Sequence, residues 1–182
     1  MTTMPSAAQI VRFWEEAGPD KWFTKDEAFD ADIRARFLEA HESAARCELS
    51  AWEDNAEGAL ALLLLLDQFP RNLFRNSAHA FATDAMARRI ADDALEHGFD
   101  GEVGEALRVF FYLPLMHSES VDDQERCVAL CDRPGLEENF KFAQTHLDII
   151  ERFGRFPHRN AVMGRITTAE EEAFLDSGGF AG

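Results

Sequence analysis

Apolar residues recur at helical spacing in nearly every segment of this chain, and no segment alternates apolar and polar residues as a half-buried strand would. In residues 26–46, Phe29, Ile33 and Phe37 are four apart, which places them on one face of a helix. In residues 55–69, leucines cover all sides of the expected helix, so this helix should be the most buried. The sequence therefore predicts an all-α fold of about eight helices in antiparallel pairs, with no sheet.

Capping and helix-breaking residues mark the expected helix ends. Ser6 with Gln9, and Thr168 with Glu171, have the spacing of a capping box at the start of two helices. Pro70 has no N–H to donate to the preceding turn, so it is expected to end or kink the central helix. No linker or low-complexity segment interrupts the chain.

The acidic composition argues against two classes of partner. The 182 residues include 34 acidic and 18 basic side chains, with a formal net charge of −16. Non-specific binding to nucleic acid needs a cationic surface that displaces counterions, and anionic membranes also attract cationic segments. We therefore expect no nucleic acid and no membrane as partners. The length suits a single all-helical domain over residues 1–182.

The chain has three cysteines, at positions 47, 127 and 131. An odd, sparse set gives no disulfide framework, and Cys127 and Cys131, four apart on an expected helix, are interpreted as structural thiols. The first residues lack the basic region and long apolar run of a signal peptide. The longest apolar run, residues 59–66, is too short to span a membrane. A cytoplasmic location is expected.

Asp67 lies on an apolar helix face, because it follows a run of leucines. An ionised carboxylate is costly to bury without a partner, so a cation is expected beside it, and Arg71 and Arg75 are the nearest in sequence. Two interpretations stay open. Asp67 and its arginine partner either form a structural ion pair that fixes the turn after Pro70, or they belong to a ligand-binding or catalytic site.

A second group of polar residues lies near the C-terminus. The stretch "RFGRFPHRNAVMGR", residues 152–165, contains four arginines and a histidine but no acidic residue. It follows a helix on which His146 shares a stripe with Phe142 and Ile149, so His146 is expected to point inward. An inward histidine is most often a hydrogen-bonded core residue, but this one leads directly into the basic stretch. His117 and Glu119 lie in a loop between two other helices.

The motifs of several enzyme classes are missing from the sequence. There is no GxSxG, Walker A loop, dinucleotide-binding glycine pattern or HExxH spacing. The cysteines that follow His117 and Glu119 do not have the spacing of a zinc deaminase. A metal site built from His117, Glu119, His146 and His158 stays an alternative, but no metal and no cofactor are assigned.

Three segments resemble the family called domain of unknown function 924. They are "LLLDQFPRNLFR" (64–75), "FFYLPLMHSES" (110–120) and "THLDIIERFGRFPHRN" (145–160). The resemblance implies an all-α fold with a tetratricopeptide-like superhelical arrangement, and it implies no activity. Many of the signature positions are polar and lie at helix ends broken by proline or glycine, so the three segments are expected to form the walls of one pocket.

The main hypothesis is a pocket for a small anionic metabolite, in which a hydrolase-like acid–base reaction can take place. Arginines would hold a carboxylate or phosphate, and a histidine would be the general acid or base, because histidine titrates near neutral pH. The expected catalytic residues are His117, Glu119, His146 and Asp67. The expected ligand-binding residues are Arg71, Arg75, Arg155, His158, Arg159 and Asn160.

Two alternatives stay open. A helical-repeat interaction module would bind a peptide or protein partner in a concave groove. Alternatively, the polar groups form a buried network of ion pairs that fixes irregular turns and binds nothing.

Overall fold

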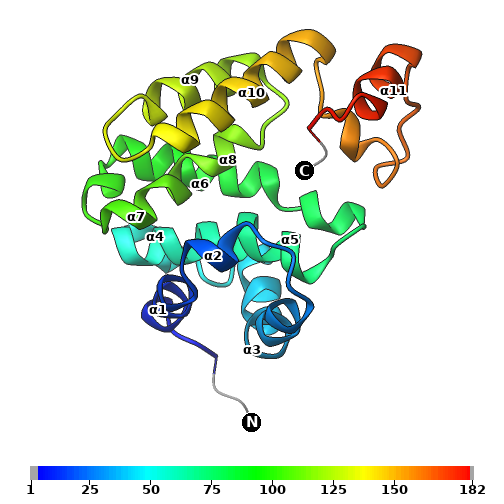
Figure 1. Cartoon of the computed structure of the whole chain (residues 1–182). Coiled ribbons are helices and arrows are strands. Elements are labelled where there is room, and N and C mark those ends of the chain that lie inside the picture. The colour runs from blue at the N-terminus through cyan, green and yellow to red at the C-terminus, as the bar shows by residue number, and fades with distance from the viewer. Residues whose placement is uncertain (1–3, 181–182) are drawn as a thin grey trace. The chain divides into compact units, whose positions relative to one another are not determined.

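The computed structural model describes residues 4–180, and within this range the chain forms helices and turns but no strand (Figure 1). This confirms the all-α prediction. The chain divides into two compact units: residues 79–114 join the N-terminal part up to Arg75 in the first, and residues 76–78 join the part from Leu115 onward in the second. Each unit is described by itself, so a single domain and a tetratricopeptide-like superhelix stay predictions.

The first unit contains most of the helices. They are α1 (Ala7–Ala17), α2 (Pro19–Trp22), α3 (Glu27–Ala45), α4 (Ala56–Leu63), α5 (Phe69–Leu73), α6 (Asp84–Glu96) and α7 (Glu105–Arg108), with α8 (Leu113–Met116) leading into the second unit. Short 3₁₀ turns lie between them, at Ser50–Asp54, Ala78–Phe81, Phe99–Gly101 and Val109–Phe111. The second unit contains α9 (Val121–Cys131), α10 (Glu137–Phe153), a 3₁₀ turn (Pro157–Arg159) and α11 (Ala169–Asp176).

The predicted start of α1 is confirmed in detail. Ser6 accepts a hydrogen bond from the Gln9 backbone, and the Gln9 side chain accepts one from the Ser6 backbone, which completes the capping box. The buried face of α1 is made by Ile10, Phe13 and Trp14. Burying such side chains is the main contribution of an amphipathic helix to stability.

The central helix does not stop at Pro70 but changes its winding just before it. A π-helix at Leu64–Gln68 joins α4 to α5, and Pro70 lies in the first turn of α5. Pro70 has no N–H to offer the carbonyl of Leu66, and the Thr83 hydroxyl donates to that carbonyl instead, at 2.5 Å. The neighbouring Leu65 carbonyl accepts from His41 Nδ1 at 2.8 Å. Side chains of other elements thus replace the backbone bonds that the irregularity removes.

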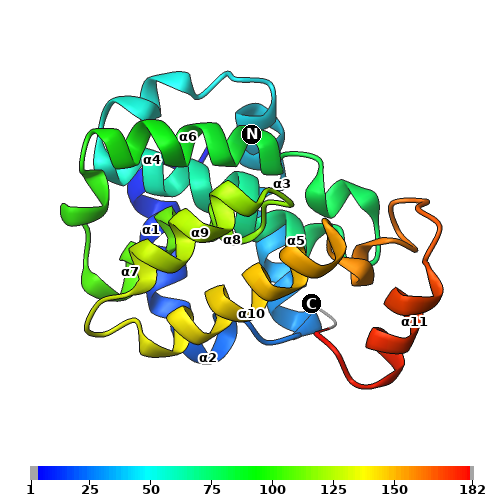
Figure 2. The ribbon, with the colours of Figure 1, turned by 90° about the horizontal axis from the view of Figure 1, so that it is seen from above.

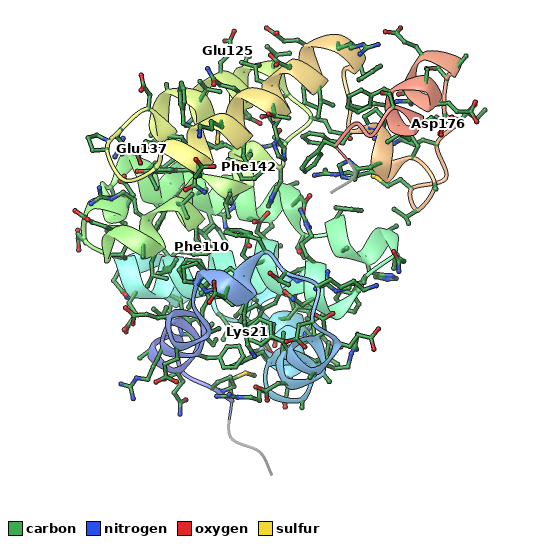
Figure 3. The ribbon with its side chains drawn as sticks, viewed as in Figure 1. Lys21, Phe110, Glu125, Glu137, Phe142 and Asp176 are labelled. Atoms are coloured by element: carbon green, nitrogen blue, oxygen red, sulfur yellow. The ribbon has the colours of Figure 1, made fainter. Side chains whose placement is uncertain are left out.

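In the second unit, α9 and α10 are an antiparallel pair that lies side by side in both views (Figures 1 and 2). Ala143 and Ile150 are buried on α10, and Cys127 and Cys131 are buried on α9. Glu125 lies on the exposed face of α9 (Figure 3). The pairing follows from the short turn between the helices, which leaves two amphipathic faces no other arrangement.

A smaller apolar cluster follows α10. Ile149, Ile150 and Phe156 are buried, and Phe174 of α11 and Phe180 pack against them. The predicted capping box of α11 is confirmed, with Thr168 accepting from the Glu171 backbone and Glu171 accepting from the Thr168 backbone. The C-terminal helix is therefore anchored at its first turn.

The prediction that His146 points inward is confirmed, because its side chain is 6% exposed. Phe142, one turn earlier on the same stripe, is 52% exposed, whereas its neighbour Ala143 is fully buried. The buried face of α10 therefore passes through Ala143 at this end of the helix and not through Phe142. Within residues 4–180, we find no helix with both the length and the apolar character that crossing a membrane requires.

Candidate functional site

The end of α10 positions the basic stretch. Gly154 has a φ of +68°, a left-handed conformation that ends the helix and that glycine adopts without strain. The chain then enters the 3₁₀ turn Pro157–Arg159, which Pro157 starts. This places Phe156 in the apolar cluster and presents His158, Arg159 and Asn160 in succession, as the proline and glycine spacing predicts.

Two histidines lie against the same phenylalanines. The ring of His146 lies 5.4 Å from that of Phe156 and 4.5 Å from that of Phe180, between ring centroids. His158 lies 5.7 Å from Phe156 and 5.4 Å from Phe180. His146 Nδ1 lies 2.7 Å from the Phe142 carbonyl, so that nitrogen carries the proton and donates, and Nε2 is left with the lone pair.

Both histidines are uncharged at neutral pH. Burial, helped by the nearby His117 and Arg159 and opposed by the hydrogen bond to the Phe142 carbonyl, lowers the pKa of His146 to about 4. Burial also lowers the pKa of His158 to about 4, with Arg159 and His146 acting in the same direction. His146 and His158 thus lie near enough to Arg159 for its charge to act on both.

Arg159 lies beneath this group. It is 7% exposed, and its guanidinium carbon lies 4.4 Å from the centre of the Phe156 ring, a cation–π distance. Its charge lowers the pKa of Glu119 and of both histidines near Phe156. A buried cation of this kind attracts anions and keeps neighbouring imidazoles neutral.

Glu119 connects the loop after α8 to the basic stretch. It accepts from both terminal nitrogens of Arg165, the shortest bond being 2.7 Å, and from the Phe156 backbone at 2.9 Å. Burial alone would raise the pKa of Glu119, but these hydrogen bonds and the charges of Arg165 and Arg159 lower it overall. Glu119 is therefore a carboxylate at neutral pH, and it orders the turn that carries His158.

Arg155 and Asn160 are both bound to Glu171 of α11. Arg155 donates through Nε at 2.6 Å and through a terminal nitrogen at 2.8 Å, and Asn160 donates at 3.2 Å. Glu171 is 2% exposed, and the hydrogen bonds from Arg155 lower its pKa to about 2. The basic stretch thus takes counter-charges from acidic residues of the chain itself: Arg165 pairs with Glu119, and Arg155 pairs with Glu171.

Several buried polar atoms of the basic stretch have no hydrogen-bond partner among the described residues. They are His158 Nδ1, Asn160 Oδ1 and Arg165 Nε. Asn160 is fully buried, and leaving such an atom unpaired costs about 1–3 kcal/mol. Atoms of this kind are usually satisfied by ordered water or a ligand.

The remaining predicted residues lie in the first unit. Asp67 is 1% exposed and pairs with Arg71 at 3.7 Å, which confirms one of its two expected partners. Arg71 also makes a double hydrogen bond to Asp84, at 2.8 and 2.9 Å. Arg75 does not pair with Asp67; it bonds through two nitrogens to Asp30 of α3.

The sequence-predicted residues thus divide between the units. His117, Glu119, His146, Arg155, His158, Arg159 and Asn160 lie in the second, and Asp67, Arg71 and Arg75 lie in the first. One pocket lined by all of them stays a prediction. Among residues 4–180, no group of three or more histidine, cysteine or acidic side chains is placed to hold a metal ion.

Sequence reasoning missed four partners of these residues. They are Asp30, Asp84, Arg165 and Glu171, and each pairs with a residue on a distant element. Glu171 had a signal, because its capping box already predicted an ordered side chain, and Arg165 lies in the basic stretch itself. No sequence signal identified Asp30 or Asp84 as a partner, because nothing in their local sequence distinguishes them from other acidic residues on helices.

Comparisons with known proteins agree with the segments singled out above. The family model described as "Bacterial protein of unknown function (DUF924)" matches residues 10–179. A solved structure of a protein of unknown function, ATU0120 from Agrobacterium tumefaciens, is 54% identical, with a TM-score of 0.91; the match covers 94% of this chain and 97% of that one. No curated protein matches. The chain belongs to the DUF924 family.

Proposed function

We propose that the second unit binds a small anionic metabolite, through a carboxylate or phosphate group, beside Arg159. The observation that carries the proposal is the buried Nδ1 of His158, which has no hydrogen-bond partner among the described residues and lies next to Arg159 in sequence. An anion with a hydroxyl or a protonated oxygen would satisfy both groups together. Asn160 Oδ1, also unpaired, would accept from the same ligand.

Arg159 is the cation best suited to this role. The other three arginines of the basic stretch hold carboxylates of the protein: Arg152 binds Glu170, Arg155 binds Glu171, and Arg165 binds Glu119. A guanidinium has five N–H donors in a planar fork, more than one carboxylate uses, so Arg159 can contact a ligand whatever else it binds.

The acid–base role falls to the histidines. Because the pKa values of His146 and His158 are about 4, both imidazoles are neutral at pH 7 and can accept a proton. His146 Nε2 carries the accepting lone pair, since Nδ1 donates to Phe142. A bound anion would offset the field of Arg159 and raise both pKa values toward neutrality, which is the range a general base needs. A hydrolase-like reaction of an anionic substrate fits these groups, in the cytoplasm.

The experiment compares two single variants in a ligand screen. Inorganic phosphate, citrate and a panel of phosphorylated and carboxylated metabolites are tested for a rise in melting temperature of the wild-type chain, followed by calorimetry. Arg159→Gln should abolish the rise and keep the helical circular dichroism spectrum. The matched control is Arg152→Gln, which removes an exposed arginine of the same stretch and should keep the rise.

Three outcomes would contradict the proposal. One is that no anion stabilises the wild-type chain while Arg159→Gln lowers its melting temperature, which supports a buried structural network. Another is an equal loss of binding in both variants. The last is stabilisation by acidic peptides alone, which supports the interaction module.

A further inference from the structure

Two reduced cysteines of the second unit form a pair on α9. Cys127 and Cys131 are free of disulfides, one helical turn apart, and both 0% exposed. Each thiol acts on the pKa of the other, which rises for Cys127 and falls for Cys131, so the two sulfurs lie close together. Thiols held this close in a dry environment are a preformed pair of soft ligands.

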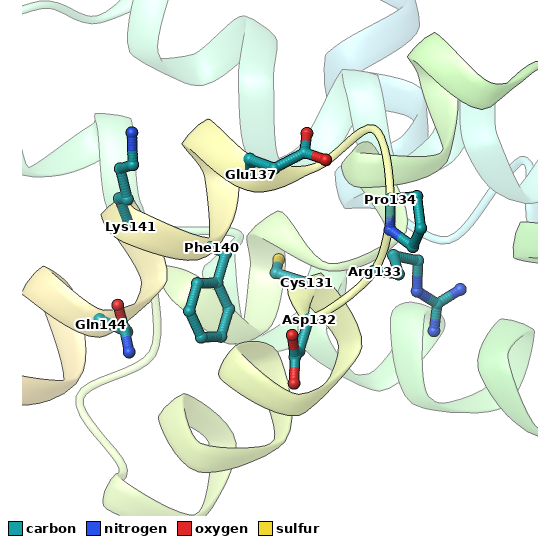
Figure 4. Close-up of a pocket in the computed structure, with 8 residues that line it drawn as sticks. All are labelled: Cys131, Asp132, Arg133, Pro134, Glu137, Phe140, Lys141 and Gln144. Atoms are coloured by element: carbon teal, nitrogen blue, oxygen red, sulfur yellow. The ribbon is translucent and has the colours of Figure 1, made fainter.

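One of the two thiols borders a pocket. The pocket has a volume of about 550 Å³ and lies between the end of α9, the following turn and the start of α10. Cys131 at the end of α9 and Arg133 in the following turn line one side of the pocket. Phe140, Lys141 and Gln144 of α10 line the other side (Figure 4). The Cys131 side chain lies on the side of α9 that faces α10 (Figure 4).

Helix geometry separates the chemical possibilities for this pair. Side chains four apart on a helix have Cβ atoms about 5–6 Å apart. A disulfide needs a Cβ–Cβ distance of about 3.5–4.5 Å, so closing one here would distort the helix. An ion placed between the two sulfurs needs no such closure, because its bonds to sulfur span the extra distance.

The ligand number selects the kind of ion. A structural zinc site takes four ligands, and no group of three or more histidine, cysteine, aspartate or glutamate side chains among residues 4–180 is placed to hold a metal ion. A soft monovalent ion such as Cu(I) favours thiolates. Binding would release the two thiol protons and leave one net negative charge, and the positive charge of Arg133 lies close enough to Cys131 to offset it.

We propose that Cys127 and Cys131 form a two-coordinate site for a soft monovalent cation of the Cu(I) type, reached through the pocket beside α10. The site is separate from the histidine cluster and does not depend on the proposed anion binding. It contains no redox step, because the ion binds and leaves as Cu(I) and only protons are exchanged.

The test is a competition for Cu(I) under anaerobic conditions between the whole chain and a colorimetric chelator. The wild-type chain should retain one Cu(I). Cys127→Ser and Cys131→Ser should each weaken retention by more than about 100-fold, since losing even an outer-shell partner costs a metal site about 10–100-fold. The control is Cys47→Ser, which removes the exposed third cysteine and should leave retention unchanged.

The proposal is overturned if Cys131→Ser retains Cu(I) as the wild type does, or if Cys47→Ser loses it. If either buried variant fails to fold, X-ray absorption of the loaded wild-type chain decides. Two sulfur neighbours and no nitrogen or oxygen would support the site. A single sulfur, or a mixed shell, would overturn it.

Discussion

Glu171 binds Arg155 through both of its carboxylate oxygens, at 2.6 and 2.8 Å, and its side chain is 3% exposed. The adjacent Glu170 pairs with Arg152 at 2.9 Å, but its side chain is 65% exposed. Two consecutive glutamates of α11 thus make the same kind of ion pair in opposite environments. The first pair anchors α11 to the turn after α10, and the second lies in water, where ion pairs contribute little.

Glu171→Gln should lower the free energy of unfolding by about 2 kcal/mol, because it removes charged hydrogen bonds to Arg155 and leaves buried donors unsatisfied. The matched control, Glu170→Gln, should change it by less than about 0.5 kcal/mol. Urea denaturation of the three chains measures both. Equal effects of the two substitutions would show that the buried pair does not anchor α11.

The stability that Glu171 supplies should depend on pH with a defined sign. Its folded pKa of about 2 lies below the ordinary value of 4.5. The stabilisation is therefore complete above pH 4.5 and is lost as the pH falls from 4.5 toward 2, where the folded state also takes up the proton. Chemical denaturation across this range should show a smaller acid loss for Glu171→Gln than for the wild type. Parallel curves would contradict the assignment.

His146 and His158 should make the free energy of unfolding depend on pH in a higher range than Glu171 does. The folded pKa values of His146 and His158, about 4, lie below the ordinary value of 6.5, so the unfolded chain takes up protons that the folded chain does not. Stability should therefore fall as the pH is lowered from 6.5 to 4, by about 2–3 kcal/mol for each buried histidine. His146→Gln should flatten the unfolding free energy over this window. A wild-type curve that is flat between pH 6.5 and 4 would contradict the burial of neutral imidazoles.

The helices could be read from the sequence because their signals are local. The capping boxes of α1 and α11 and the glycine after α10 involve residues within one turn of one another. Ion-pair partners could not be read in the same way: Arg75 and Asp30 are 45 residues apart, and Arg155 and Glu171 are 16 apart. Their meeting depends on how whole helices pack, and a chain with 34 acidic residues offers many candidates for each arginine.

The π-helix shows the same limit at the centre of the first unit. Pro70 predicted an end or a kink of the central helix, whereas the helix continues through Pro70 with a change of winding that Thr83 and His41, distant in sequence, support. The sequence of residues 64–68 alone gives no reason for a wider turn. Its position at Asp67 and Gln68 is of interest because such insertions occur often at functional sites.

Arg75 tests the division between ligand-binding and structural arginines. Its guanidinium is bonded to Asp30, which also accepts from Asn72 at 2.8 Å, so the three side chains fasten α5 to α3. Arg75→Gln should lower the free energy of unfolding by about 1 kcal/mol and leave any anion-induced rise in melting temperature intact. The opposite pattern, with unchanged stability and lost anion binding, would return Arg75 to the ligand site that the sequence predicted.

Thr83 and Pro70 should be energetically coupled, although Pro70 lies in α5 and Thr83 in the turn before α6. Among the described side chains, only the Thr83 hydroxyl donates to the Leu66 carbonyl, and Thr83→Val removes that donor. The carbonyl stays buried, so the substitution should lower the free energy of unfolding by about 1–3 kcal/mol. Pro70→Ala restores a backbone N–H that can donate to the same carbonyl once the helix regains its regular winding. The double variant should therefore lose less stability than the sum of the two single losses, with an interaction energy of about 0.5–1 kcal/mol. Unfolding free energies of the four chains provide the cycle, and strict additivity would show that the Thr83 hydroxyl does not substitute for the missing proline N–H.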